Sequence, residues 1–257
     1  YSANCGAPTE VNYFYRSTAG GPLRPLPSPD ARPDDLATIE VNGETVNYIV
    51  RHELGTINRF IYSVYLLTPN PDDPRQPDLS AWNRNLIYSF GGGVGIGHSQ
   101  SNGFITGWVT GPEGRDLHVP LLERGYAVIG STGTGTNTTY NLLLTGQTAA
   151  MVKRQFVTAY ADPDHTFGLG GSGGAIQQYI YEQNIPHLLD ALMPLETFGD
   201  MITQINPIGD CELHEFYFDV GNAFANGTGV VNPKWTDWEN RQLIEGLNAI
   251  NGAPTDW

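Results

Sequence analysis

Apolar and polar residues alternate in the first part of the chain in the way that β-strands require. The alternation runs over residues 39–50 and is interrupted only by Asn42-Gly43. Asn-Gly is a preferred dipeptide of the type I′ turn, so this segment predicts a β-hairpin. A run of apolar and aromatic residues at 60–67 predicts a second strand region, which ends at the stretch 69–78, rich in proline and aspartate.

From residue 85 onward, short apolar runs alternate with segments of helical periodicity. The apolar runs predict buried strands at 86–90, 126–129, 166–169 and 191–195. Apolar residues three and four positions apart predict helices at 121–123, 142–160 and 175–182. Strands that alternate with helices are typical of βαβ units and of a mostly parallel sheet. The pattern therefore predicts an α/β protein whose sheet is flanked by helices.

The pattern also divides the chain into three parts. Residues 1–37 are expected to form an N-terminal extension with a linker, because residues 20–35 are dense in proline. Residues 38–200 carry the alternating strands and helices and form the expected core. After that the pattern loosens, and residues 201–257, with Trp235 and Trp238, are expected to form a lid or interface segment.

Composition and charge exclude several classes of protein. The chain has 27 acidic and 13 basic residues, a net charge of -14, which argues against a nucleic-acid binder. No apolar run approaches the roughly 20 residues that span a bilayer, and no signal peptide is expected to remain at the start. The acidic stretch 69–78 lacks the ligand pattern of a calcium loop, so neither a metal nor a cofactor is expected. Cys5 and Cys211 allow either a disulfide or two buried thiols.

Gly170-Gly171-Ser172-Gly173-Gly174 satisfies the pattern G-x-S-x-G and lies between a predicted strand and a predicted helix. Such a turn forces the serine to positive φ and presents its hydroxyl at the end of the sheet, while the glycines let strand and helix approach. Glycine-rich turns also bind phosphate. This turn, however, lacks both the P-loop lysine and the spacing of a dinucleotide-binding fingerprint. We therefore predict that Ser172 is the nucleophile of an acyl transfer.

A second glycine-rich turn, residues 91–95, follows an earlier strand. The tetrahedral oxyanion of acyl transfer needs two backbone N–H donors, one of them from the residue after the nucleophile. Gly173 is the first expected donor, and Gly92 or Gly93 is the second. A run of glycines alone indicates little, and its position two βα units before the serine strengthens the hypothesis.

Five segments together resemble the α/β-hydrolase superfamily: LIYSFGGGVG, LLERGYAVIGSTGT, AAMVKRQFV, HTFGLGGSGGAIQQYIYEQ and LLDALMPLETF. More closely, residues 39–218 resemble a bacterial secreted family of unknown function that is distantly similar to tannase, feruloyl-esterase and hydroxybutyrate-oligomer hydrolase proteins. The resemblance implies an α/β-hydrolase fold, a secreted or periplasmic location, and a serine hydrolase that acts on an ester or related acyl bond through Ser172.

The nucleophile needs a histidine base and an orienting carboxylate, which in α/β-hydrolases follow the serine in the chain. Only His187 and His214 follow Ser172. His187 is expected at the far end of the next helix, and His214 is the candidate base although it comes early for this fold. Possible acids are Glu196 and Asp200. The earlier histidines are expected to be structural, or near the substrate in the case of His98; they are His52, His98, His118 and His165.

Members of the resembled family are much longer than this chain, which implies that the fold is incomplete here and ends in a lid insertion. A second polypeptide, as in a processed or heteromeric enzyme, is expected to supply the histidine and the acid. The alternatives are a complete chain that uses His214, an inactive binding module with the hydrolase sheet, and an acyltransferase that uses the same serine. The expected ligand is a small or oligomeric ester.

Overall fold

The computed structural model describes residues 7–70, 75–93, 118–197, 216–221, 227, 229–237, 239–240 and 243 of the 257-residue chain. The chain divides into two compact units, Tyr1–Thr197 and Phe198–Trp257. In the second unit, a π-helical turn at Tyr217–Gly221 and a 3-10 turn at Pro233–Trp235 are described, and the rings of Phe218 and Trp235 lie 4.7 Å apart. All strands and α-helices named below belong to the first unit.

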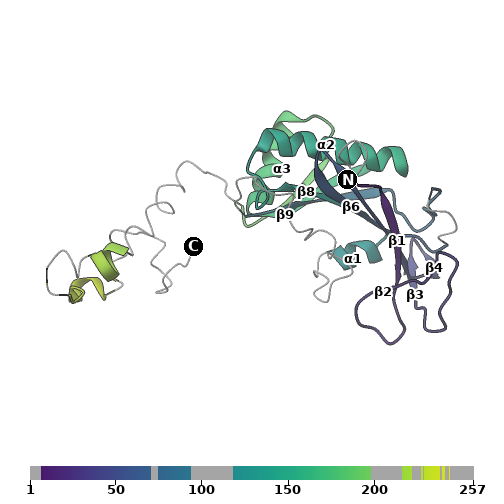
Figure 1. The fold of residues 1–257 in the computed structure, drawn as a ribbon, viewed down its shortest axis with the longest axis horizontal. Helices are drawn as coiled ribbons and strands as arrows, with labels where there is room; N and C mark the ends of the chain where they lie inside the picture. The colour runs from purple at the N-terminus through teal and green to yellow at the C-terminus, as the bar shows by residue number, and fades with distance from the viewer. Residues whose placement is uncertain are drawn as a thin grey trace. The chain divides into compact units, whose positions relative to one another are not determined.

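The first unit is built on a mixed sheet of eight strands (Figure 1). The strands are β1 (Glu10–Tyr15), β2 (Arg24–Pro25), β5 (Ile49–Ile57), β6 (Phe60–Leu67), β7 (Asn85–Gly91), β8 (Ala127–Gly135), β9 (His165–Gly171) and β10 (Ala191–Leu195). Their spatial order is β10-β9-β7-β8-β6-β5-β1-β2. The four strands from β10 to β8 are parallel, whereas β6 is antiparallel to both of its neighbours.

Three helices lie between the parallel strands along the chain. They are α1 (His118–Glu123), α2 (Leu142–Ala159) and α3 (Gly173–Asn184). In the spatial order β7 lies beyond β8, next to β9, and β6 pairs antiparallel with β8. A helix precedes each of the strands β8, β9 and β10 along the chain. This is the topology of an α/β-hydrolase sheet. The described elements therefore form part of an α/β-hydrolase fold, which confirms the predicted fold class.

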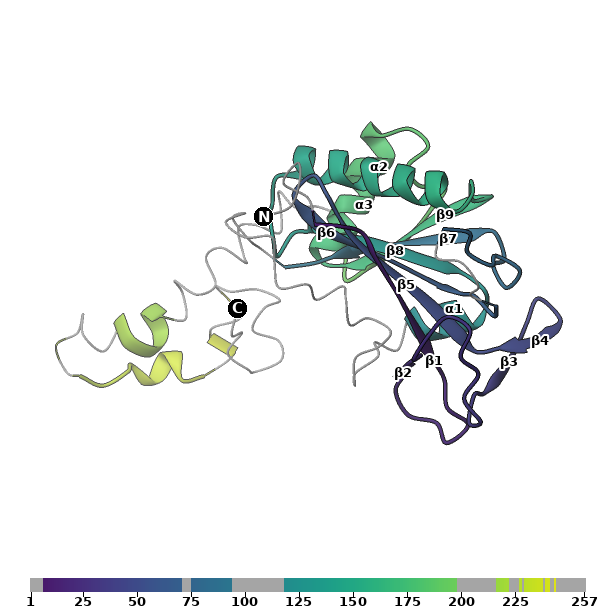
Figure 2. The same ribbon diagram turned by 45° about the vertical axis from the view of Figure 1, so that its right-hand side comes forward.

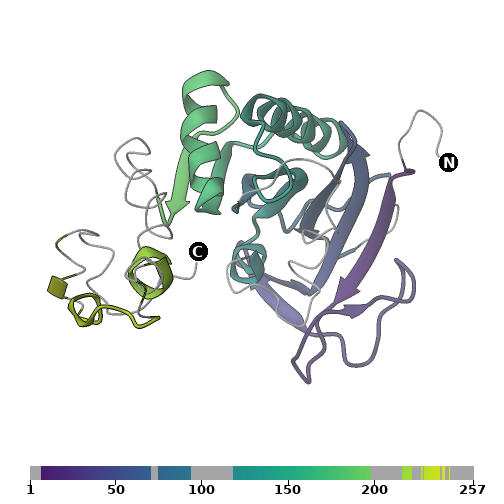
Figure 3. The same cartoon turned by 60° about the vertical axis from the view of Figure 1, so that its left-hand side comes forward.

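The sheet is covered on both faces (Figures 2 and 3). On one face, Val152 and Phe156 of α2 and Tyr181 of α3 pack against Tyr88 and Phe90 of β7. On the other face, Leu122 of α1 belongs to a second cluster with alternate residues of the same strands, such as Ile87 and Val128. Burial of each large side chain contributes about 1.5–3 kcal/mol. Because β7, β8 and β9 are buried from both sides, their carboxyl ends form a rigid edge that supports the site.

The hairpin predicted around Asn42-Gly43 is confirmed, as β3 (Thr38–Val41) pairs with β4 (Glu44–Asn47). The two turn residues have φ of 53° and 79°, as a type I′ turn requires. The predicted strands at 60–67 and 191–195 are also confirmed.

The sheet begins earlier along the chain than the periodicity predicts. Within the expected N-terminal extension, residues 10–15 form β1, which pairs with β5, and alternate residues Tyr13 and Tyr15 are buried. β5 itself is a separate nine-residue strand. Its charged residues Arg51 and Glu53 mask the apolar pattern, because they lie inside the protein rather than on its surface.

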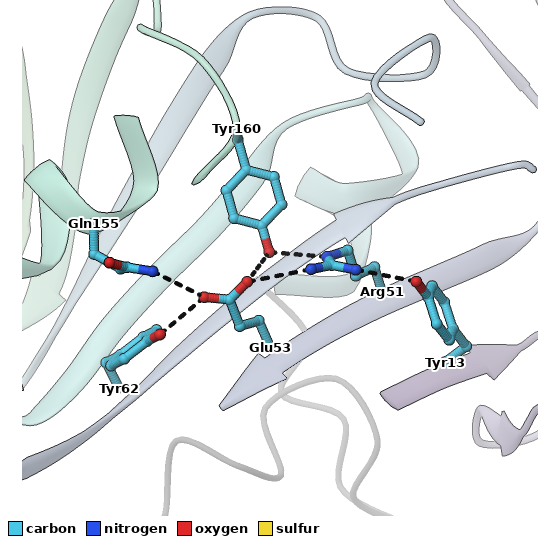
Figure 4. Close-up of polar contacts among 6 residues, drawn as sticks. All are labelled: Tyr13, Arg51, Glu53, Tyr62, Gln155 and Tyr160. Atoms are coloured by element: carbon cyan, nitrogen blue, oxygen red, sulfur yellow. Dashed lines mark hydrogen bonds and ion pairs between the residues drawn. The ribbon is translucent and has the colours of Figure 1, made fainter. Parts of the chain in front are cut away.

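A buried polar cluster explains how those charges are accommodated (Figure 4). It consists of Tyr13, Arg51, Glu53, Tyr62, Gln155 and Tyr160. Arg51 and Glu53 form an ion pair of 3.3 Å with side chains only 3% and 4% exposed. The Glu53 carboxylate also accepts hydrogen bonds from the hydroxyls of Tyr160, at 2.7 Å, and Tyr62, at 2.8 Å. Burial, together with the Glu53 charge, raises the pKa of Tyr160 well above its ordinary value. The cluster joins β1, β5 and β6 to the end of α2.

Candidate active site

Ser172 occupies the sharp turn between β9 and α3. Its backbone has φ 53° and ψ −120°, a conformation that costs a residue with a side chain about 1–3 kcal/mol. The Ser172 N–H donates to the Leu195 carbonyl of β10 at 3.1 Å, and its side chain makes no hydrogen bond to the end of the helix. The hydroxyl is therefore not used to cap α3.

Glycines make this turn possible because the neighbouring backbone is too close for side chains. A methyl group on Gly170 or Gly174 would lie 2.5 Å from the carbonyl oxygen of Phe90 in β7. A methyl group on Gly173 would overlap the hydroxyl of Thr136, which follows β8. The glycines of the G-x-S-x-G segment therefore allow β9 and α3 to approach β7 and β8.

The turn after β7 lies directly beside Ser172. A methyl group on Gly92 would lie 3.2 Å from Ser172 Cβ and 3.5 Å from the Gly173 nitrogen. Gly93, with φ 91°, instead lies against Asn137, whose Cβ would be 2.9 Å from a methyl group there. The structure thus brings together Ser172, Gly173 and Gly92, while Gly93 packs against the segment after β8.

Two buried glutamines of α3 support these turns. The Gln177 Nε2 donates to the Gly91 carbonyl at 3.0 Å and, more weakly, to the Gly173 carbonyl at 3.4 Å. The Gln178 Nε2 donates to the carbonyls of Gly170 and Gly174, both at 3.1 Å. Both glutamine side chains are completely buried. Sequence reasoning missed them because glutamine in a helix ordinarily indicates an exposed position; the adjacent pair so close to the elbow was the available signal.

Glu196 lies immediately after β10, next to the serine turn. Residue 195 pairs with residue 171, and the Glu196 Oε2 would be 3.3 Å from a methyl group on Gly171. Its φ of 46° is also in the left-handed region. Two non-glycine residues with positive φ, Ser172 and Glu196, therefore lie at the carboxyl ends of neighbouring strands. Strained backbone of this kind concentrates at functional sites.

The described histidines have other environments. The His52 ring stacks on Tyr65 with centroids 4.1 Å apart, and burial lowers the pKa of His52 to about 3. The His118 Nε2 lies 3.0 Å from the hydroxyl of Ser89. His165 begins β9, roughly 20 Å from the serine end at 3.3 Å per residue, and His187 lies beyond the far end of α3. None of these four, within the described part of the chain, is placed as a partner of Ser172.

Several predicted residues lie outside the described residues, namely His98, Asp200, His214, Cys5, Cys211 and Trp238. The candidate base and the possible disulfide therefore remain predictions. The described residues hold a strained serine, the glycine turn after β7 close to it and a nearby carboxylate. This arrangement can perform nucleophilic attack on a carbonyl once a base is added.

The helices among the described residues are all too short or too polar to cross a membrane.

Comparison with known proteins finds a matching family and several similar solved structures. The chain matches the "Tannase-like family of unknown function (DUF6351)" over residues 1–255, which confirms the resemblance to tannase-related hydrolases. Among solved structures, tannin acyl hydrolase from Aspergillus niger is similar, with 12% sequence identity and a TM-score of 0.30. The match covers 62% of this chain and 30% of that one, so the chain spans less than a third of the solved protein. No curated protein sequence matches the chain.

Proposed function

We propose that this chain, which belongs to the tannase-like family, is the nucleophile-bearing part of a serine hydrolase that cleaves carboxylic esters. The observation that carries the proposal is the conformation of Ser172, with φ 53° between β9 and α3 and the glycine turn of β7 beside it. A serine that is held in a strained turn without a capping role is typical of a nucleophile elbow.

In the proposed reaction, the Ser172 Oγ attacks the ester carbonyl carbon while its proton passes to a base. The carbonyl π electrons move to the oxygen, and the resulting oxyanion accepts hydrogen bonds from the N–H groups of Gly173 and Gly92. Collapse of this intermediate expels the alcohol, which takes the proton from the base and leaves an acyl group on Ser172. Water then attacks the acyl group, its proton passes to the base, and the carboxylic acid leaves as the serine hydroxyl re-forms.

The choice of Gly92 over Gly93 as second donor follows from the packing. Gly173 is the first residue of α3, so its N–H has no carbonyl one turn earlier to bond. A methyl group on Gly92 would lie within contact distance of this nitrogen and of Ser172, whereas one on Gly93 would meet Asn137. Loss of a single oxyanion donor lowers kcat by about 10²–10³-fold in a serine hydrolase.

Glu196 is the carboxylate that we assign to the orientation of the base. It follows Ser172 in the chain, as the acid of an α/β-hydrolase does, and its carboxylate lies beside Gly171 at the same sheet edge. The base itself comes from outside the described residues, either as His214 or as a histidine of a second polypeptide. These two sources predict opposite results for a His214→Ala variant.

The edge of the sheet supports the participation of a further polypeptide segment. Among the described strands, only β9 pairs with β10, and the side chain of Leu195 is 44% exposed there. The Leu195 carbonyl faces β9, so by alternation the backbone nitrogen of Pro194 faces outward, where it offers no N–H. An added strand would pair through the other backbone groups of β10 and would bring its own residues to the serine edge. A secreted or periplasmic location also remains part of the proposal, on the strength of the family resemblance.

Ester hydrolysis tests the proposal. The full chain is assayed on p-nitrophenyl acetate, p-nitrophenyl butyrate and methyl gallate, alone and after co-purification from its native source. Ser172→Ala is expected to abolish turnover, whereas Ser80→Ala, at an exposed serine, is expected to retain it. If Ser172→Ala is as active as the native chain, the proposal fails. A folded chain that binds esters without any turnover, with and without its co-purifying material, favours the inactive binding module instead; transfer of the acyl group to an added alcohol favours the acyltransferase.

A further inference from the structure

We infer that Gln177 is a positioning residue that orients the Gly92 N–H toward the oxyanion, an inference that rests on the proposed function. Gln177 begins the second turn of α3, five residues after Ser172, and its side chain is fully buried. Its Nε2 donates to the Gly91 carbonyl at 3.0 Å, so it connects the helix of the nucleophile to the turn of the second oxyanion donor.

Because the peptide bond is planar, the hydrogen bond from Gln177 to the Gly91 carbonyl also sets the direction of the Gly92 N–H. The Gly91 carbonyl and the Gly92 N–H belong to one trans peptide unit, in which C=O and N–H point in opposite directions. A donor that holds the Gly91 carbonyl in the interior therefore points the Gly92 N–H away from the interior. The same carbonyl also accepts the Thr136 N–H at 3.1 Å and, more weakly, the Thr136 hydroxyl at 3.5 Å, so Gln177 and Thr136 together fix the plane of this peptide.

An irregularity in β7 lies directly before this carbonyl. The pairing of β7 with β8 shifts register between Ser89 and Gly91, as in a β-bulge. Bulges occur near active sites, where they redirect backbone groups and interrupt the regular ladder of hydrogen bonds. Gln177 supplies a donor to the carbonyl that follows this interruption.

The orientation of the Gln177 amide is itself determined by its other partners. Its Oε1 accepts the Tyr181 hydroxyl at 3.0 Å, and that hydroxyl is hydrogen-bonded to the hydroxyl of Thr145 in α2. Its Nε2 faces two carbonyl oxygens, those of Gly91 and Gly173. A flipped amide would place an oxygen against these carbonyls, and so would a glutamate. The chain Thr145–Tyr181–Gln177–Gly91 thus links both covering helices to the oxyanion turn.

The test compares Gln177→Met with Glu53→Gln. The methionine keeps the length of the side chain and removes the donor. Glu53→Gln perturbs the buried cluster of Figure 4, on other strands, and serves as the control for lost stability. For Gln177→Met we expect kcat on p-nitrophenyl butyrate to fall about 10–100-fold with KM changed less than threefold, since Thr136 still donates to the Gly91 carbonyl. For Glu53→Gln we expect kcat within threefold of the native value at a temperature where both variants are folded.

A second readout uses a boronic acid that adds to Ser172 and places an oxygen of the anionic tetrahedral boronate in the oxyanion site. Its affinity is expected to fall about as much as kcat in Gln177→Met and to be unchanged in Glu53→Gln. The inference is overturned if the native chain turns over ester while Gln177→Met keeps its kcat and its boronate affinity. It is also overturned if the only change in Gln177→Met is a higher KM. If the native chain does not hydrolyse ester, or if Ser172→Ala keeps the native activity, the proposed function fails first and this inference falls with it.

Discussion

Substitution of Ser172 by glycine is expected to stabilise the protein, although glycine ordinarily destabilises. Ser172 holds φ 53° and ψ −120°, which costs about 1–3 kcal/mol for a residue with a Cβ and little for glycine. Glycine gains more backbone freedom in the unfolded chain, which offsets about 0.5–1 kcal/mol of this. The expected net stabilisation is about 0.5–2 kcal/mol relative to Ser172→Ala, which removes the hydroxyl but retains the Cβ.

The measurement is the unfolding of the native chain, Ser172→Ala and Ser172→Gly in urea and by heat. For a unit of this size, each kcal/mol shifts Tm by about 2–4 °C, so the glycine variant should melt measurably above the alanine variant. Ser172→Ala should melt close to the native chain, because the hydroxyl makes no hydrogen bond to the end of α3. If glycine is the less stable of the two variants, Ser172 is not strained and the elbow geometry is wrong.

The remaining predictions concern the packing, the buried charges and the acid. Gly173→Ala should cost about 1–3 kcal/mol of stability by urea unfolding, because its methyl group overlaps Thr136. Adding Thr136→Ala to this variant should restore part of the loss, and equal stability of the single and double variants would contradict the prediction. Glu53→Ala should cost about 3–5 kcal/mol, since it leaves the Arg51 charge buried without its carboxylate, and a loss below 1 kcal/mol speaks against the cluster. The lowered pKa of His52 means that the unfolded chain binds a proton between about pH 6.5 and pH 3 that the folded chain does not. Stability should therefore fall as the pH is lowered through this window, by up to about 1.4 kcal/mol per pH unit, and His52→Phe should flatten this slope. Glu196→Gln should lower kcat on p-nitrophenyl butyrate at least about tenfold with little change in KM, and full activity removes Glu196 from the mechanism.

The fold could be predicted largely from local patterns. The Asn42-Gly43 turn, the apolar strands and the helical spacing at 142–160 all depend on neighbouring residues, and α2 ends within one residue of its predicted limit. The turn at Ser172 was predictable for the same reason, because strand, glycines and helix adjoin in the sequence.

What the sequence concealed depends on contacts between distant segments. Charged residues in a strand indicate a surface position, yet Arg51 and Glu53 neutralise each other inside the protein together with Tyr160, more than 100 residues away. Gln177 is likewise of a residue type that is usually exposed in helices. Its amide can donate to the Gly91 carbonyl only because β7 packs against α3 in the folded protein. The proposed base cannot be found by periodicity, because a histidine that serves Ser172 would be brought to it by folding rather than by its position in the sequence.

The most direct test of the central claim is the reaction of the protein with a fluorophosphonate, followed by intact mass and peptide mapping. We predict a single adduct on Ser172 that is absent from Ser172→Ala, and labelling that requires either His214 or a co-purifying polypeptide. Loss of labelling in His214→Ala identifies the base within this chain, and loss on removal of the second polypeptide places it there. A properly folded sample, with its partners present, in which Ser172 stays unmodified would contradict the claim that Ser172 is an activated nucleophile.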